Sequence, residues 1–311
     1  MKKYRLAFVG TPKIALPSLT TLHNDQRFEI ITVITQPDMP AGRNLELTPP
    51  PVKTLAETLG LSVFQPQKIS QIIDQLREMQ LDAMVVIAYA QIVPETILNL
   101  PKYGCINVHG SLLPKYRGAA VLQAPILNHD SETGVTIMLM DKTLDTGPIL
   151  KQQAWPITDN ETAGSLGEKM ADIGAQILGD TLVDYFEGRI KPEAQNNELA
   201  NYVGKLTKED GLIDWTKPAK TLECFVRAMS PWPSAWTWLN GKKIKILAVD
   251  PHIISLNMHR PGKTFIYNST LAIQCGTDAL IIKQLQLEGK KAMAAEEFLK
   301  GYNDFIGKVL G

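Results

Sequence analysis

The feature that most limits how this chain can fold is the alternation of short apolar segments with amphipathic ones along its first half. The apolar segments have the length of a strand and are mostly apolar on both faces, as in a parallel sheet that is covered on both sides. The segments between them carry apolar residues at helical spacing. The expected strands are 4–9, 28–35, 83–88 and 104–110, and the expected helices are 50–60 and 68–80. Together they predict right-handed βαβ units and a doubly wound, mostly parallel α/β sheet of the Rossmann-like kind.

The rest of the chain divides into three parts. Strands at 133–141 and 147–157 and a long helix at 161–187 complete the first pattern, and the stretch 188–210 is polar with no sustained period. After a helix near 217–229, short β-like runs are separated by Gly, Asn and Pro, which predicts a small antiparallel, OB-like β-barrel. These runs are 235–239, 243–249, 262–267, 270–275 and 279–287. We therefore expect a catalytic domain at 1–190, a linker at 191–207 and a β-barrel domain at 208–311.

Composition excludes several classes of protein. A length of 311 residues exceeds one typical core, and 44% hydrophobic and 21% charged residues are ordinary for a globular chain. The longest apolar run, 83–90, is far shorter than the roughly 20 residues that cross a bilayer. The N-terminal "MKKYRLAFVG" predicts a first strand rather than a signal peptide. Three widely spaced cysteines without a CxxC pair predict reduced thiols in the cytoplasm and no metal site.

Charge is distributed unevenly although the net charge is zero. From residue 205 onward the chain has 15 Lys and Arg against 10 Asp and Glu, which leaves 17 against 22 before it. A basic C-terminal part fits a polyanionic partner, but it fits an ordinary solvated surface at least as well.

The stretch "GCINVHGSLLPKYRGAA" (104–120) places polar side chains at the end of an apolar strand. Because side chains alternate across a strand, Asn107 and His109 share one face, with Cys105 behind them. In open α/β sheets, ligands bind at the carboxyl ends of strands, and Gly110 breaks the chain just after this pair. Taken alone, the pair is also explained as a strand end that is hydrogen-bonded to the next loop.

Its surroundings favour a catalytic site. The run "INVHGSLLPKYRGAA", followed by "ETGVTIMLMDKTLDTGPIL" (132–150), resembles the folate-dependent formyltransferases, and the likeness extends to "KLTKEDGLIDW" (205–215) and "RAMSPWPSAW" (227–236). The resemblance implies a catalytic set of Asn107, His109 and Asp145. A dinucleotide-binding Rossmann enzyme is disfavoured, because the first turn is Gly10-Thr11-Pro12 rather than G-x-G-x-x-G.

The resemblance also implies the reaction. A formyl group passes from 10-formyltetrahydrofolate to the α-amine of methionine on methionyl-initiator tRNA, with no metal, no membrane and no obligate protein partner. Small-molecule acceptors, such as a nucleotide-linked amino sugar or glycinamide ribonucleotide, are the alternative. Amine attack gives a tetrahedral anion that needs hydrogen-bond donors, a role that suits Asn107 and His109. His109 is equally suited to moving a proton, with Asp145 orienting its ring.

Two groups of binding residues are expected: the folate contacts and Arg43 are implied by the resemblance, whereas Lys243 and Lys245 are expected because they share one face of a predicted strand in the basic C-terminal part. The folate-binding residues are expected to be Ser111, Leu112, Leu113, Pro114, Ile87, Tyr89, Ala90 and Asp141. The residues expected to contact tRNA are Arg43, Lys243 and Lys245. The chain departs from the family pattern where Asn44, Leu45 and Glu46 replace most of a basic run, and where Ala90 replaces Gly.

Overall fold

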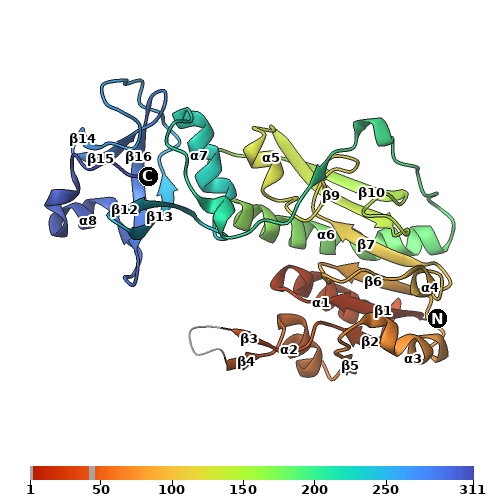
Figure 1. Ribbon diagram of the computed structural model, residues 1–311. Helices are drawn as coiled ribbons and strands as arrows, with labels where there is room; N and C mark the ends of the chain where they lie inside the picture. Colours follow the sequence, from red (N-terminus) through yellow and green to blue (C-terminus); the bar gives the residue numbers. More distant parts are fainter. Residues whose placement is uncertain (1–2, 42–45) are drawn as a thin grey trace. The chain divides into compact units, whose positions relative to one another are not determined.

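The computed structural model describes residues 3–41 and 46–311, and the chain divides into two compact units. Unit 1 comprises Met1–Gly118, Thr133–Trp155 and Gly167–Tyr202, and unit 2 comprises Ala119–Glu132, Pro156–Leu166 and Val203–Gly311. Each unit is built around its own large sheet (Figure 1). Among the described helices, none combines the length and the apolar character needed to cross a lipid bilayer.

Unit 1 contains a seven-stranded sheet. In sheet order its strands are β10 (Ile149–Pro156), β9 (Glu132–Leu139), β7 (Cys105–His109), β6 (Ala83–Ile87), β1 (Tyr4–Gly10), β2 (Phe28–Ile34) and β5 (Val63–Phe64). Neighbours from β7 to β5 are parallel, whereas β7 and β9 are antiparallel. The predicted mostly parallel sheet is confirmed.

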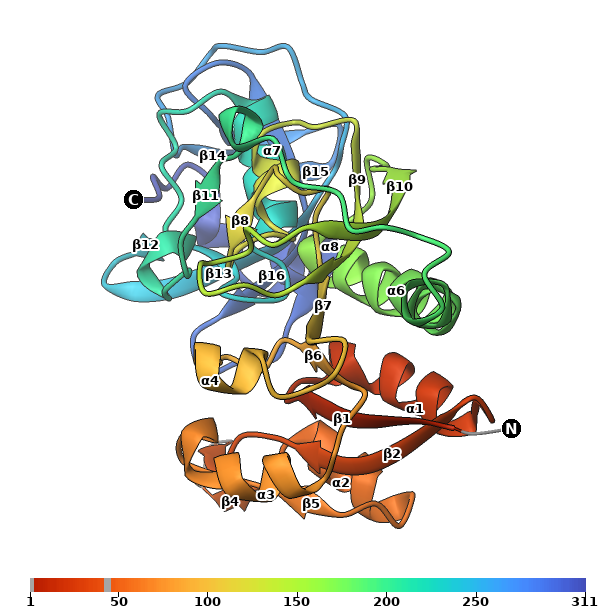
Figure 2. The same ribbon diagram turned by 90° about the vertical axis from the view of Figure 1, so that its right-hand side faces the viewer.

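Helices cover both faces of this sheet, and Figure 2 shows α4 to the left of β6 and α1 to its right. The helical segments are η1 (Lys13–Ala15), α1 (Leu16–Asn24), α2 (Pro51–Thr58), η2 (Ile69–Ile72), α3 (Ile73–Glu78), α4 (Glu95–Leu98), α6 (Ala163–Phe186) and η3 (Asn197–Leu199). On β7, Val108 faces α6, because a Cβ on Gly174 would lie 3.0 Å from its Cγ1. The thiol of Cys105 faces α4 and donates to the carbonyl oxygen of Ile97 at 3.9 Å. Alternation along the strand therefore places Asn107 and His109 on the α4 side.

Unit 2 contains a sheet of six strands that pair antiparallel. The antiparallel pairing is as predicted, but only five strands were expected, and closure into a barrel stays a prediction. In sheet order they are β12 (Ala235–Leu239), β13 (Lys242–Val249), β16 (Ala279–Leu287), β15 (Thr270–Gln274) and β14 (Thr264–Tyr267), and β17 (Met293–Ala294) also pairs with β16. The helical segments are α5 (Ala124–Leu127), η4 (Glu209–Gly211), α7 (Ala219–Ala228), α8 (Ala295–Gly301) and η5 (Asn303–Phe305). Its core joins Leu222 of α7 and Phe298 of α8 to Ile244 and Leu285 of the sheet.

Two pairs of short strands lie outside these sheets. Strand β3 (Met39–Ala41) pairs with β4 (Glu46–Thr48), and β8 (Arg117–Gly118) pairs with β11 (Tyr202–Val203). The amide of Arg117 donates to the carbonyl oxygen of Asn201 at 2.9 Å. Part of the segment expected to be a linker is therefore bonded to the loop that follows β7.

Candidate active site

Strand β7 carries Asn107 and His109 to the carboxyl end of the parallel part of the sheet. His109 is 6% exposed. All five residues of β7 are described, and of these only Asn107 is not buried. The strand then ends at Gly110, so the two side chains lie where the chain leaves the sheet. The position is the one at which α/β sheets bind ligands.

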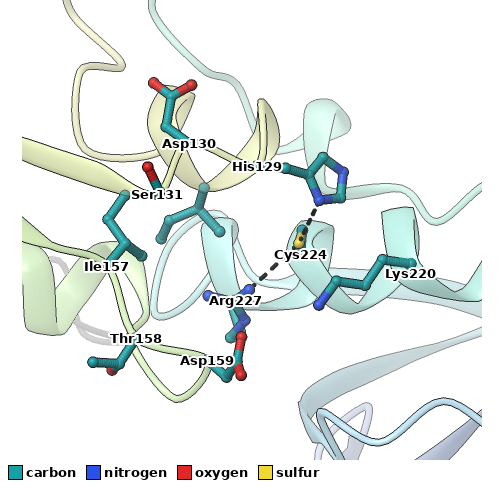
Figure 3. A pocket seen from close by; sticks show the side chains of 10 residues that line it. His129, Asp130, Ser131, Ile157, Thr158, Asp159, Lys220, Cys224 and Arg227 are labelled. Atoms are coloured by element: carbon teal, nitrogen blue, oxygen red, sulfur yellow. Dashed lines mark hydrogen bonds between the residues drawn. The ribbon is translucent and has the colours of Figure 1, made fainter.

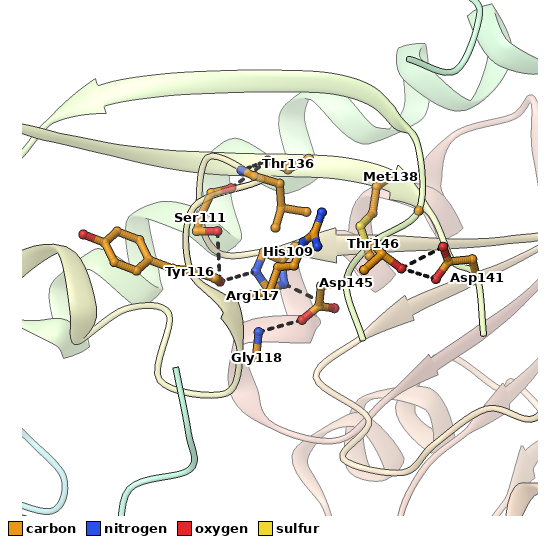
Figure 4. Close-up of polar contacts among 12 residues, drawn as sticks. His109, Ser111, Tyr116, Arg117, Gly118, Thr136, Met138, Asp141, Asp145 and Thr146 are labelled. Atoms are coloured by element: carbon orange, nitrogen blue, oxygen red, sulfur yellow. Dashed lines mark hydrogen bonds and ion pairs between the residues drawn. The ribbon is translucent and has the colours of Figure 1, made fainter. Parts of the chain in front are cut away.

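The imidazole of His109 lies between a carbonyl group and a carboxylate (Figure 4). Its Nε2 is 3.0 Å from the carbonyl oxygen of Tyr116, and its Nδ1 is 3.8 Å from Oδ1 of Asp145. Because a carbonyl oxygen only accepts hydrogen bonds, Nε2 carries a proton and donates in this arrangement. The structure thus brings the side chains of His109 and Asp145 together, as the sequence predicts.

Asp145 reaches His109 from the loop between β9 and β10. Its Oδ2 accepts a hydrogen bond from the amide of Gly118 at 2.8 Å, and its backbone has a φ of +55°. Two residues later the loop passes so close to β9 that a Cβ on Gly147 would lie 1.8 Å from the carbonyl oxygen of Leu139. Glycine at 147 is therefore what lets the loop lie against β9 while it presents Asp145.

The predicted folate-binding loop, residues 111–114, is fixed by hydrogen bonds to Thr136 of β9. The Thr136 hydroxyl donates to the carbonyl oxygen of Ser111 at 2.6 Å and accepts from the amide of Leu113 at 3.1 Å. Gln152 donates to the carbonyl oxygen of Leu113 at 2.8 Å. Ser111 and Leu113 are buried, whereas Leu112 and Pro114 are half-buried, so the latter two offer side-chain surface to a ligand.

Asp141, also expected to bind folate, has its carboxylate engaged within its own loop. Its Oδ1 accepts from the amide of Thr143 at 3.0 Å and from the hydroxyl of Thr146 at 2.6 Å. The residue is exposed. In this arrangement it shapes the turn that leads to Asp145, and a contact with folate stays a prediction.

The segment expected to form a wall of the pterin pocket follows β6 directly. The side chains of Ile87 and Tyr89 are only 1% and 2% exposed, whereas Ala88 and Ala90 are exposed. Burial raises the pKa of Tyr89 to about 12, and its buried hydroxyl has no hydrogen-bond partner among the described residues. Ile87 and Tyr89 therefore offer backbone rather than side-chain surface in this conformation.

Of the residues expected to contact tRNA, two lie in β13 and one lies outside the described residues. Arg43 lies outside the described residues. Lys243 and Lys245 lie on one face of β13, opposite Trp238 and Trp236 of β12 respectively. The ammonium group of Lys243 lies 3.6 Å from the centre of the Trp236 ring. It is therefore held in a cation–π contact rather than extended into solvent.

Several polar residues at the site escaped the sequence analysis. Arg117 is 2% exposed, and its guanidinium group donates to Gln195, Asn197 and Tyr202. The side chain of Asn201 accepts from the amide of Tyr116. The one feature of the sequence that could have pointed to these contacts is the polar composition of 188–210. A solvated linker has the same composition, so composition alone does not identify the contacts.

Unit 2 has a separate cavity of about 210 Å³ that contains none of the predicted site residues (Figure 3). On its wall the thiol of Cys224 lies 3.2 Å from Nδ1 of His129 and donates to Glu223 at 3.3 Å. Burial, with a smaller effect of the nearby Glu223 carboxylate, raises the pKa of Cys224 to about 11. The protonated thiol is a poor nucleophile, so the Cys–His contact does not form an activated pair.

Among the described residues, no group of three or more His, Cys, Asp or Glu side chains is arranged to hold a metal ion. The chemistry available at β7 is that of an amide, an imidazole and a carboxylate. These groups can stabilise a developing oxyanion and move a proton.

Comparisons with known proteins agree with this chemistry. A family model described as formyl transferase matches residues 4–182, and one described as formyl transferase, C-terminal domain, matches residues 205–303. A curated methionyl-tRNA formyltransferase from Citrifermentans bemidjiense is 43% identical over 100% of this chain and 98% of its own length. One from Trichlorobacter lovleyi is 44% identical, also over 100% and 98%.

A solved structure provides a comparison of the fold. The N-formyltransferase from Helicobacter canadensis, in complex with folinic acid and dTDP-3-aminofucose, matches with a TM-score of 0.67 and 20% identity. The match covers 90% of this chain and 98% of the other. At that identity, the likeness concerns the fold alone.

Proposed function

Because the chain belongs to the methionyl-tRNA formyltransferases of the formyl transferase family, we propose that Asn107, His109 and Asp145 carry out its reaction. The chain is an enzyme that formylates the methionine carried by initiator tRNA. The donor is 10-formyltetrahydrofolate. The observation that carries the site assignment is the His109 imidazole at the end of β7, 3.8 Å from Asp145 and two residues from the half-buried Asn107.

The reaction needs hydrogen-bond donors where negative charge develops. When the α-amine bonds to the formyl carbon, the carbonyl π electrons move to oxygen; their return breaks the bond between that carbon and the folate nitrogen. Over the whole step the amine loses one proton and the folate nitrogen gains one. The Asn107 amide donates to the transient oxyanion, and removal of one such donor typically costs about 10²–10³ in turnover.

His109 moves the proton or donates to the same oxygen. In the free chain its Nε2 donates to the carbonyl oxygen of Tyr116. Catalysis therefore requires the imidazole to exchange one of its present partners for the substrate. Asp145 keeps the ring oriented during this exchange, because its own carboxylate is held by the amide of Gly118.

Folate binds beside these residues. Leu112 and Pro114 cover the flat pterin, and the fixed backbone of Ser111 and Leu113 meets its polar edge, as do the backbone groups of Ile87, Tyr89 and Ala90. Asp141 contributes by holding the turn before Asp145. The hydrogen bonds of Thr136 support this assignment, because they give the loop one defined shape before a ligand arrives.

The methionyl-initiator tRNA is bound in part by residues 208–311, which we take as an OB-like barrel domain with Lys243 and Lys245 near phosphates. Arg43 contacts the acceptor end from the catalytic domain. The basic excess after residue 205 supports this role, since phosphate binding depends on Lys and Arg. The enzyme works in the cytoplasm, where charged tRNA is used.

A transfer assay tests the proposal. Labelled 10-formyltetrahydrofolate is offered together with methionyl-tRNA, a nucleotide-linked amino sugar or glycinamide ribonucleotide. We expect formyl transfer to methionyl-tRNA alone. Transfer to the sugar or to the ribonucleotide alone would contradict the assignment of the acceptor.

A further inference from the structure

The side-chain amide of Gln195 joins two loops of the candidate site. Its Nε2 donates to the carbonyl oxygen of Asp145 at 2.9 Å and to that of Gly147 at 2.7 Å. Its Oε1 accepts from Nη2 of Arg117 at 2.7 Å and from Nε at 3.2 Å. One side chain therefore connects the loop after β7 to the loop that carries Asp145.

These four bonds use the full capacity of the amide. An amide nitrogen has two hydrogens to donate, and an amide oxygen has two lone pairs that accept. A carboxylate at position 195 would keep the bonds from Arg117 but would place oxygen against two carbonyl oxygens. An apolar side chain would lose both sets of bonds.

The hydrogen bonds from Gln195 to Asp145 and Gly147 lie where the backbone of the loop has an unfavourable conformation. Asp145 has a φ of +55°, a left-handed conformation that is uncommon for any residue with a Cβ. Such a conformation persists only where surrounding contacts fix it. Gln195 fixes the carbonyl groups on both sides of Thr146, and thereby the direction in which the Asp145 carboxylate leaves the loop.

Arg117 anchors Gln195 in turn. Arg117 is 2% exposed, and its guanidinium group also donates to Oδ1 of Asn197 at 2.7 Å and to the hydroxyl of Tyr202 at 3.0 Å. Among the described residues, every side chain that accepts a hydrogen bond from the Arg117 guanidinium group is neutral. No carboxylate of the described residues therefore competes with Gln195 for this group. The neighbours of Arg117 in sequence contact the catalytic pair directly: Tyr116 accepts from His109, and Gly118 donates to Asp145.

We propose that Gln195 is a positioning residue of formyl transfer, which sets Asp145 against His109 from a segment outside both the sheet and the catalytic loops. The inference rests on the roles proposed for Asn107, His109 and Asp145. It adds that the segment 195–202 is part of the catalytic machinery rather than a connection between domains.

A double-mutant cycle on the full-length enzyme tests it. Gln195→Glu and Gln195→Leu are each made in the wild-type chain and in Asp145→Asn, and kcat and both KM values are measured with thermal unfolding. In the wild-type chain we expect each to lower kcat by about 10–100-fold, since a displacement of 1 Å can cost about 10². The KM values should stay within about twofold, because ground-state binding is not affected.

The Asp145→Asn background distinguishes positioning from a general loss of structure. If Gln195 acts through the Asp145 carboxylate, its substitution should lower kcat by less than about twofold there, because the effects of coupled residues do not add. Gln195→Glu keeps the Arg117 bonds and should still fold, so it gives a result even where Gln195→Leu fails to fold. Gln153→Leu is the matched control, because Gln153 is exposed and its amide bonds the adjacent carbonyl oxygen of Ala154; it should leave kcat unchanged.

Two results would overturn the inference alone: wild-type kcat in Gln195→Glu, or equal losses in the two backgrounds. A wild-type rate in Asp145→Asn itself would instead remove the proposed catalytic set on which the inference depends.

Discussion

At the scale of single residues, Asn107 and His109 differ in whether their side chains already contact other groups of the protein. His109 is buried and held between Tyr116 and Asp145. Asn107 is half-buried, and among the described residues no hydrogen bond involves its side chain. An amide that the fold does not use is available to a substrate.

Replacement of Asn107 by alanine should therefore affect catalysis without affecting the fold. We expect kcat to fall by about 10²–10³ through loss of one oxyanion donor, with little change in the free energy of unfolding. Single-turnover rates and chemical denaturation measure the two quantities. A near wild-type rate would mean that another group stabilises the oxyanion.

Glu223 gives a prediction about stability and pH. It is 1% exposed and lies 2.5 Å from Nε of Arg227. Burial alone would raise the pKa of Glu223, but the hydrogen bond and charge of Arg227 outweigh it and the pKa is lowered. The resulting stabilisation is present above the pKa of an unfolded glutamate, about 4.3, and is lost as the pH falls through the lower folded value.

Glu223→Gln should accordingly lower the free energy of unfolding near pH 7 by about 3–5 kcal/mol, because it leaves the Arg227 charge buried and unpaired. The difference from the wild type should shrink as the pH falls below about 4.3, because the unfolded wild-type glutamate is protonated there while the folded one still keeps its charge. Denaturant titrations at several pH values measure this. Glu296→Gln, at an exposed position in α8, is the control; an equal effect in both variants would exclude the ion pair as the cause.

At the scale of elements, apolar periodicity predicted most of the strands and the longest helix, but it did not predict α1 or α8, which also contribute buried side chains. The strands at 235–239 and 279–287 occur with the expected bounds, and the helix expected at 161–187 is α6, Ala163–Phe186. The helix expected over 68–80 lies at the right place but is divided at Ile72, whose ψ of 22° is not that of an α-helix. Apolar spacing does not distinguish a 3-10 turn from an α-helical turn.

The elements that position the candidate site do not follow from motifs. The catalytic roles of Asn107, His109 and Asp145 stay predictions, and these residues were named from motifs. Gln195 was not, because a segment whose polar side chains bond to the protein has the same composition as one whose side chains bond to water. The antiparallel direction of β9 was also unpredictable, since strand periodicity does not specify which way a neighbouring strand runs.

The loop between β9 and β10 gives an element-scale prediction. Gly147→Ala would place a Cβ 1.8 Å from the carbonyl oxygen of Leu139, so the loop has to move away from β9. We expect a loss of about 1–3 kcal/mol in stability, as for other overpacked sites, together with a reduced kcat through displacement of Asp145. Gly204→Ala is the control, because a Cβ added at that position would meet no atom within 4 Å. Unchanged kcat in Gly147→Ala would show that the loop tolerates the shift.

At the scale of the whole molecule, the units do not follow the order of the sequence. Unit 2 includes Ala119–Glu132 and Pro156–Leu166 as well as Val203–Gly311, and Ile126, Ala163 and Leu166 belong to its core. Removal of residues 208–311 would therefore expose part of that core. Point substitutions on β13 are a cleaner test of tRNA binding than truncation.

We expect Lys245→Ala to reduce the salt dependence of tRNA binding. Loss of one phosphate contact should lower the slope of log affinity against log salt by about 0.7–0.9, without a change in folate affinity. Filter binding over a range of salt concentrations measures the slope. Lys300→Ala, an exposed lysine in α8, should leave the slope unchanged, and an unaltered slope in Lys245→Ala would place the phosphate contacts elsewhere.

The bond between Gln195 and Asp145 also has a consequence for the timing of protein synthesis. The two residues are 50 positions apart, and Gln195 is the later one to leave the ribosome. At about 5–20 residues per second, the Asp145 carbonyl group is made roughly 3–10 s before the amide that holds it. A nascent chain that ends before residue 195 already contains Asn107, His109, Asp145 and the Gly118 amide that bonds the carboxylate, but it lacks the side chain that bonds the backbone carbonyl groups of Asp145 and Gly147. Formylation activity should therefore arise on the ribosome later than the three proposed catalytic residues do.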